Sequence, residues 1–135
     1  MIFVDTNVFM YAVGRPHPLR EPARGFFAVC NRDRIPLVTS AEAMQELVHA
    51  YLPVGRTATF DAALALVERC EVDVWPLTHE DVTLARQLHD RYPGLGARDL
   101  CHLASCRRRG VGDIKTFDRA LAAVAGRFDI GDAGA

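Results

Sequence analysis

The stretch Ile2-Phe3-Val4-Asp5-Thr6-Asn7 decides how the rest of the sequence is interpreted. Its first three residues form a short apolar run, which is typical of a buried strand in a parallel sheet. Asp5 ends that run abruptly, and ligands of open parallel sheets bind outside the carboxyl ends of the strands. We therefore expect Asp5 to lie where chemistry is done. The structural alternative is that Asp5 serves as the N-cap of a following helix.

Length and composition predict one globular domain spanning residues 1–135. Apolar residues make up 50% of the chain and charged residues 24%, which is ordinary for a soluble protein. The formal net charge is −1, so bulk charge does not indicate nucleic-acid binding, and any basic surface has to be local.

Short β-rich segments alternate with amphipathic segments along the whole chain, which predicts an α/β fold with a mainly parallel central sheet. Strands are expected at 2–4, 37–38, 72–75 and 111–115, with an edge strand at 128–130. Helices are expected at 8–13, 19–33, 39–51, 60–70, 78–92, 100–109 and 117–125. The Gly/Ala-rich tail from about residue 131 is expected to fray.

Two capping-box patterns mark helix starts, Thr39-Ser40-Ala41-Glu42 and Thr78-His79-Glu80-Asp81. The spacing predicts core-facing side chains at Met44, Leu47, Val48 and Tyr51 in the first helix and at Val82, Ala85, Leu88 and Tyr92 in the second. A capping role is a sufficient explanation for Glu42. Glu46, one turn later on the same face, has no such explanation, and a solvated helix face is its alternative.

Four carboxylates stand at positions that a doubly wound fold brings to one end of its sheet: Asp5, Glu46, Asp99 and Asp118. Each also has an ordinary structural interpretation, such as an N-cap or a helix-dipole partner. Two unit charges about 4 Å apart repel by about 1 kcal/mol in water and by about 4 kcal/mol at an effective dielectric of 20. Such a cluster therefore needs a cation, and hard oxygen ligands favour Mg²⁺ or Mn²⁺ over zinc.

The sequence carries no sign of export or of a membrane span, so we expect a cytoplasmic protein. The N-terminus lacks a basic region, and Asp5 breaks its apolar run. Cys30, Cys70, Cys101 and Cys106 form no CxxC pair, and we expect reduced thiols.

Four segments in order resemble the PIN-domain nucleases, most closely the VapC-type toxins of bacterial toxin–antitoxin pairs. They are residues 4–8 (Val-Asp-Thr-Asn-Val), 39–47 (Thr-Ser-Ala-Glu through Gln-Glu-Leu), 97–100 (Ala-Arg-Asp-Leu) and 115–118 (Lys-Thr-Phe-Asp). The resemblance implies a three-layer α/β/α sandwich that often forms a homodimer. It also implies that Asp5, Glu46, Asp99 and Asp118 bind one or two Mg²⁺ or Mn²⁺ ions. Asn7 and Thr116 would be secondary site residues.

The function that this resemblance implies is Mg²⁺-dependent endoribonuclease activity of a toxin, controlled by a cognate antitoxin protein. Candidate residues for an RNA-contacting rim are Arg15, Arg20, Arg98, Arg107, Arg108 and Arg109, and ordinary surface or helix-end arginines are their alternative. Two other functions stay open. One is a non-toxin RNA-processing nuclease, and the other is a catalytically silent module that binds RNA or protein.

Overall fold

The computed structural model of the protein describes residues 1–125. The elements are β1 (Ile2–Val4), α1 (Thr6–Val13), α2 (Arg20–Arg32), β2 (Leu37–Ser40), α3 (Ala41–Tyr51), α4 (Thr57–Arg69), β3 (Asp73–Trp75), α5 (His79–Arg91), α6 (Ala97–Arg108), β4 (Asp113–Lys115) and α7 (Arg119–Ala125). The edge strand expected at 128–130 and the tail from about residue 131 lie outside the described residues.

The four strands form one sheet in the order β3-β2-β1-β4, and every pair is parallel. β1 is central: Phe3 is in register with Val38 of β2 on one side and with Ile114 of β4 on the other. This central position explains why all three residues of β1 are apolar and buried.

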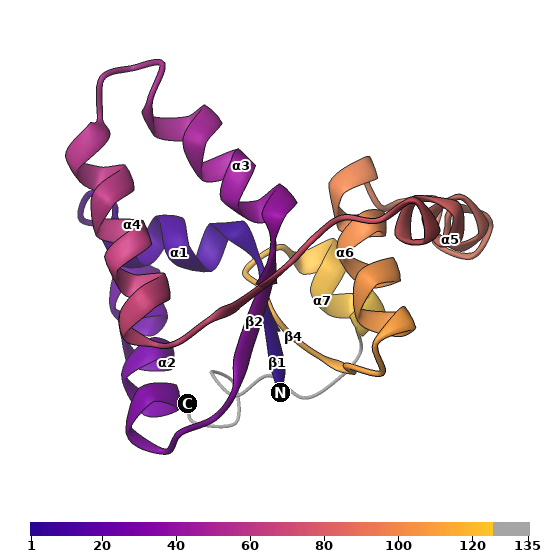
Figure 1. Ribbon diagram of the computed structural model, residues 1–135, viewed down its shortest axis with the longest axis horizontal. Helices are drawn as coiled ribbons and strands as arrows, with labels where there is room; N and C mark the ends of the chain where they lie inside the picture. Colours follow the sequence, from indigo (N-terminus) through magenta and orange to yellow (C-terminus); the bar gives the residue numbers. More distant parts are fainter. Residues whose placement is uncertain (126–135) are drawn as a thin grey trace.

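Side chains of β1 alternate between two separate cores. Ile2 and Val4 pack among residues of α1 to α4, whereas Phe3 packs among residues of α5, α6 and α7. Figure 1 shows these two groups of helices on opposite sides of the sheet. The predicted three-layer α/β/α sandwich is therefore confirmed, and it follows from the period-two alternation of a strand that is buried on both faces.

Within residues 1–125 the chain changes faces of the sheet at one place, and this locates the site. The connections from β1 to β2 and from β2 to β3 run through α1 to α4 on one face. The connection from β3 to β4 runs through α5 and α6 on the other face. The connections therefore diverge between the neighbouring strands β1 and β4, and their carboxyl ends form the topological switch point where such folds bind ligands.

The start of α3 differs from the predicted capping box. Ser40, not Thr39, is the N-cap, and its hydroxyl accepts a hydrogen bond from the Ala43 backbone N–H at 3.0 Å. Thr39 instead donates its hydroxyl to the Val4 carbonyl at 2.8 Å, which ties β2 to β1. Glu42 therefore is not at the capping position, and the predicted structural role for it is wrong. At Thr78 the predicted capping box is confirmed, with Asp81 as its partner.

Two residues predicted to face the core are exposed. The prediction for Leu47 is confirmed, but the rotation of α3 that buries Leu47 leaves its neighbour Val48 39% exposed. Val82 is 48% exposed because α5 buries Asp81 completely, and this carboxylate pairs with Arg108 at 2.7 Å. The ion pair of the buried Asp81 thus decides which face of α5 is turned toward the core. Hydrophobic spacing alone did not predict this orientation.

All four cysteines are free thiols, as expected. Over residues 1–125, every helix is too short or too polar to cross a membrane.

Candidate metal centre

Asp5 occupies the junction between β1 and α1. Its backbone N–H donates to the Lys115 carbonyl at 3.0 Å, which continues the pairing of β1 with β4. Its Oδ1 accepts the Thr6 backbone N–H at 2.8 Å, so Asp5 is the N-cap of α1, as the structural alternative proposed. The same carboxylate also lines a cavity, and the capping role and a site role therefore coexist.

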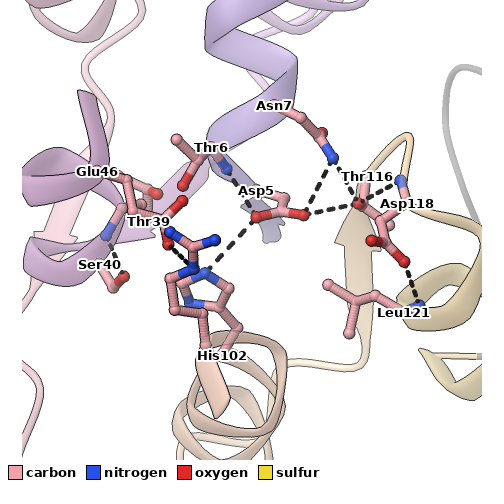
Figure 2. Close-up of polar contacts among 12 residues, drawn as sticks. Asp5, Thr6, Asn7, Thr39, Ser40, Glu46, His102, Thr116, Asp118 and Leu121 are labelled. Carbon is pink, nitrogen blue, oxygen red and sulfur yellow. Dashed lines mark hydrogen bonds and ion pairs between the residues drawn. The ribbon is translucent and has the colours of Figure 1, made fainter. Parts of the chain in front are cut away.

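A network of four hydrogen bonds connects Asp5 to the end of β4, and two of them reach Asp5 itself. Thr116 donates its hydroxyl to Asp5 Oδ2 at 2.7 Å, and the Asn7 amide donates to Asp5 Oδ2 at 3.4 Å and to the Thr116 hydroxyl oxygen at 3.3 Å. The Phe117 backbone N–H donates to the Asn7 side-chain oxygen at 3.2 Å. Figure 2 shows Asp5 at the centre of this network. The network fixes the orientation of a nearly buried carboxylate.

Asp118 follows β4 as Asp5 follows β1. Its backbone N–H donates to the Thr116 hydroxyl oxygen at 3.0 Å, and its Oδ1 accepts the Leu121 backbone N–H at 3.0 Å. The second bond lies in the first turn of α7, so Asp118 also has the capping role that was its alternative. Its side chain nevertheless borders the same cavity as Asp5.

Glu46 lies on α3 and reaches the cavity from the other side of Asp5 (Figure 2). Its Oε1 pairs with Arg98 Nε at 3.0 Å. Burial raises the pKa of Glu46, the nearby Thr6 hydroxyl and the charge of Arg98 lower it, and the charge of Asp5 raises it. The side chain is 15% exposed whereas that of Arg98 is 63% exposed, so the pair lies at the mouth of the cavity.

Asp99 lies in the first turn of α6, and its pKa depends on the charges of the other three carboxylates. Its pKa is raised to about 6, first by burial and then by the charges of Asp5, Asp118 and Glu46, against the lowering effect of Arg98. A carboxylate whose pKa responds to three others is close enough to all of them to be repelled. The four predicted acidic residues are therefore brought together.

The shared space is a cavity of about 530 Å³ at the carboxyl end of the sheet. It is lined by Asp5, Thr6, Asn7, Met10, Glu46, Gly96, Ala97, Arg98, Asp99 and Asp118. A larger cavity of about 670 Å³ lies between α1, α2 and α4, but its described lining residues include no carboxylate. The donor set of the smaller cavity is the one that suits a hard divalent cation, because four carboxylates offer oxygens and repel each other without one.

His102 is the site residue that sequence reasoning missed. It lies one turn after Asp99 on α6 and is 1% exposed, and its Nε2 is 3.6 Å from Asp5 Oδ1. Burial lowers its pKa, and the charge of Asp5 opposes that shift. Asp5, Asp99 and His102 each offer a ligand atom within 4.8 Å of the others. The available signal was the Asp-x-x-His spacing, which puts both side chains on one face of a helix.

The six candidate rim arginines lie in different places relative to the cavity. Arg98 lines the cavity, whereas the other five are absent from its described lining. Arg108 and Arg109 both pair with the buried Asp81, at 2.7 and 3.2 Å, and Arg107 donates to the Tyr92 hydroxyl at 3.3 Å. Arg15 lies in the segment between α1 and α2, and Arg20 lies in the first turn of α2.

Glu42 stays outside the described lining of the cavity. Burial and the charge of Glu46 raise its pKa, and the charge of Arg98 lowers it. Glu42 is therefore a neighbour of the acidic cluster, and the geometry favours Glu46 as the glutamate of the site.

Comparison with known proteins gives the family. A profile of the PIN domain matches residues 2–127. The chain belongs to the PIN-domain family. Within this family, the Mycobacterium tuberculosis protein Ribonuclease VapC23 is 65% identical over 122 residues, which cover 90% of this chain and 96% of that protein. Ribonuclease VapC13 of M. tuberculosis is 35% identical, over 88% of this chain and 91% of that protein.

Solved structures of the family share this fold. The crystal structure of M. tuberculosis VapC20, a sarcin–ricin loop cleaving toxin, superposes with a TM-score of 0.77 at 20% identity and covers 92% of this chain and 95% of that chain. The Rickettsia felis VapBC2 complex bound to a DNA fragment of its promoter gives 0.70 at 14% identity, over 92% of this chain and 93% of that chain. At these identities the likeness concerns the fold alone.

Proposed function

We propose that this protein is a divalent-metal-dependent endoribonuclease that hydrolyses RNA phosphodiester bonds as the toxin of a toxin–antitoxin pair. The observation that carries the proposal is the meeting of Asp5, Glu46, Asp99 and Asp118 in one cavity, where their mutual repulsion contributes to the raised pKa of Asp99. Membership in a family whose relatives are named ribonucleases supports the same reaction class.

In this proposal the four carboxylates hold one or two Mg²⁺ or Mn²⁺ ions. When bound, such a cation supplies a Lewis acid for the phosphate oxygens and lowers the pKa of a coordinated water. Asn7 and Thr116 act on Asp5, because their hydrogen bonds to Oδ2 keep that carboxylate in one orientation. Positioning of this kind matters because mutation of a residue that hydrogen-bonds to a metal ligand typically weakens metal binding by about 10- to 100-fold.

Arg98 is the best supported of the rim arginines as an RNA contact. Its side chain lines the cavity, is 63% exposed, and carries the cationic group nearest to the acidic cluster in the described lining. A guanidinium there offsets the negative field that would otherwise repel a phosphate. Arg15, Arg20, Arg107, Arg108 and Arg109 remain candidates for a more distant rim.

The decisive test is Asp5→Asn, which keeps the shape of the side chain and removes its charge. Cleavage of total cellular RNA by the purified protein should depend on Mg²⁺ and should fall by at least about a hundredfold in this variant. Asp90→Asn is the matched control, since Asp90 forms an exposed ion pair on α5 with Arg86. Undiminished metal-dependent cleavage by the Asp5 variant would refute the assignment.

RNA cleavage, a growth assay and a metal titration together distinguish the two alternatives from the proposed function. A non-toxin nuclease would cut RNA but leave bacterial growth unaffected when expressed without an antitoxin. A silent binding module would cut nothing and would bind no Mn²⁺ at millimolar concentration in a calorimetric titration.

The proposal includes a cognate antitoxin that covers the cavity and a homodimer of this chain. An antitoxin segment that presents a basic side chain would complement the acidic cluster. Coexpression with the product of an adjacent small gene should abolish cleavage, and light scattering should give twice the monomer mass for the isolated protein. A monomeric mass would remove the homodimer from the proposal without affecting the nuclease.

A further inference from the structure

His102 is a buried imidazole whose polar atoms are unpaired. It is 1% exposed, and among residues 1–125 neither ring nitrogen has a hydrogen-bond partner. Its ring packs against Phe3 with the centroids 5.1 Å apart. A buried polar group without a partner destabilises a protein by about 1–3 kcal/mol, so its presence requires an explanation. Packing alone does not provide one, because a phenylalanine would fill an apolar position without that penalty.

The unpaired Nε2 points at the acidic cluster. It lies 3.6 Å from Asp5 Oδ1, which is too long for a hydrogen bond. Figure 2 shows the ring of His102 beside Asp5, on the side away from Asn7 and Thr116. Ligands of one ion at bond lengths near 2.1 Å lie about 3 to 4 Å apart, so this separation suits two groups that bind the same cation.

Asp99 completes the arrangement. It and His102 are three residues apart on α6, so both side chains face β1 from the same side of the helix. The three ligand atoms of Asp5, Asp99 and His102 lie within 4.8 Å of one another. This set combines two oxygen donors with one nitrogen donor, and imidazole is a ligand that transition metals bind much better than Mg²⁺ does.

We propose that His102 Nε2 is a ligand of the cation that Asp5 and Asp99 bind, which makes this centre a mixed nitrogen–oxygen site with a preference for Mn²⁺ over Mg²⁺. The inference rests on the proposed function, because it concerns the metal of the same site. It differs from the all-carboxylate centre in predicting a direct metal–nitrogen bond and a dependence of metal selectivity on one histidine.

The test is pulsed electron paramagnetic resonance of Mn²⁺ bound to the purified full chain. The wild-type protein should show a ¹⁴N coupling from a directly bound imidazole, and labelling its histidines with ¹⁵N should change that coupling without any substitution. His102→Gln should lose the coupling, whereas His89→Gln should keep it, because His89 is exposed on α5. The labelling experiment keeps the proposal testable even if the His102 variant does not fold.

Calorimetric titration gives a second readout that needs no RNA. The dissociation constant for Mn²⁺ should rise in His102→Gln by more than the about 10- to 100-fold that is typical when a residue that only orients a ligand is lost, whereas that for Mg²⁺ should change less. If Mn²⁺ saturates the wild-type protein but shows no ¹⁴N coupling, His102 is not a ligand and the inference is wrong. If that protein still cuts RNA, the proposed nuclease function is unaffected. Equal losses for both ions would also overturn it and make His102 a positioning residue. Failure of the wild type to bind Mn²⁺ or cut RNA would end both proposals.

Discussion

Replacing Asp99 by Asn should stabilise the metal-free protein while it removes metal binding. The pKa of Asp99 is raised from 3.8 to about 6, and each unit corresponds to about 1.4 kcal/mol. The ionised carboxylate therefore destabilises the fold by about 3 kcal/mol before solvent screening. Because the side chain is only partly buried, we expect screening to leave about 1–2 kcal/mol.

The pH dependence has a definite sign. A carboxyl group whose pKa is raised by folding holds its proton in the folded state at pH values where the unfolded state has lost it. The destabilisation is therefore absent below pH 4, grows between pH 4 and 6, and is complete above about pH 6. Asp99→Asn should be about 1–2 kcal/mol more stable than wild type at pH 7.5 in EDTA, and this advantage should shrink toward pH 5.

Urea unfolding at pH 7.5 and 5.0, with EDTA or with Mg²⁺, measures these differences. Mg²⁺ at a hundred times its dissociation constant should stabilise the wild type by about 2.7 kcal/mol and Asp99→Asn much less. Asp90→Asn, at an exposed ion pair, should stay within about 0.5 kcal/mol of wild type throughout. Equal or lower stability of the Asp99 variant at pH 7.5 in EDTA would refute the repulsion on which the metal centre depends.

Four other substitutions distinguish residues of the site from residues that only stabilise the fold. Thr116→Val nearly keeps the side-chain shape but removes the 2.7 Å hydrogen bond to Asp5 and the bonds that the hydroxyl accepts from Asn7 and the Asp118 N–H. Calorimetry should show metal affinity reduced by about 10- to 100-fold. Asp81→Ala removes a buried carboxylate that pairs with Arg108 and Arg109 and whose pKa is lowered to about 2. It should lower the unfolding free energy by about 3–5 kcal/mol above pH 4 and by less as the pH falls toward 2, while RNA cleavage at a permissive temperature persists. Glu46→Gln should abolish RNA cleavage in a gel assay and Glu42→Gln should retain it; the opposite result would mean that the wrong glutamate was assigned.

The fold class and the positions of the acidic residues were predictable because short segments of sequence are enough to indicate them. Ile2-Phe3-Val4 is apolar throughout because β1 is covered on both faces, and Asp5 ends it because the strand ends there. The breaks between apolar runs placed the other elements to within a few residues. Asp99 and Asp118 were also recognisable, since each opens a helix beside the same sheet.

Side-chain environments required the tertiary structure because they depend on residues distant in sequence. Leu47 and not Val48 faces the core, and Asp81 and not Val82 is buried, since the neighbouring elements decide how each helix is rotated. Glu42 follows a plausible capping threonine, yet the Thr39 hydroxyl bonds to β1. Hydrophobic spacing cannot distinguish such cases when two adjacent residues are equally suited to the core or to a cap.

The sequence by itself determined which chemical groups the protein has and roughly where its strands end. The tertiary structure alone decided that four carboxylates share one cavity and that His102 faces Asp5 through the core. The physical reason is that the cavity brings together residues up to 113 positions apart, from Asp5 to Asp118, across the switch point of a parallel sheet. No local pattern encodes the resulting electrostatic field, which arises only when the strands pair.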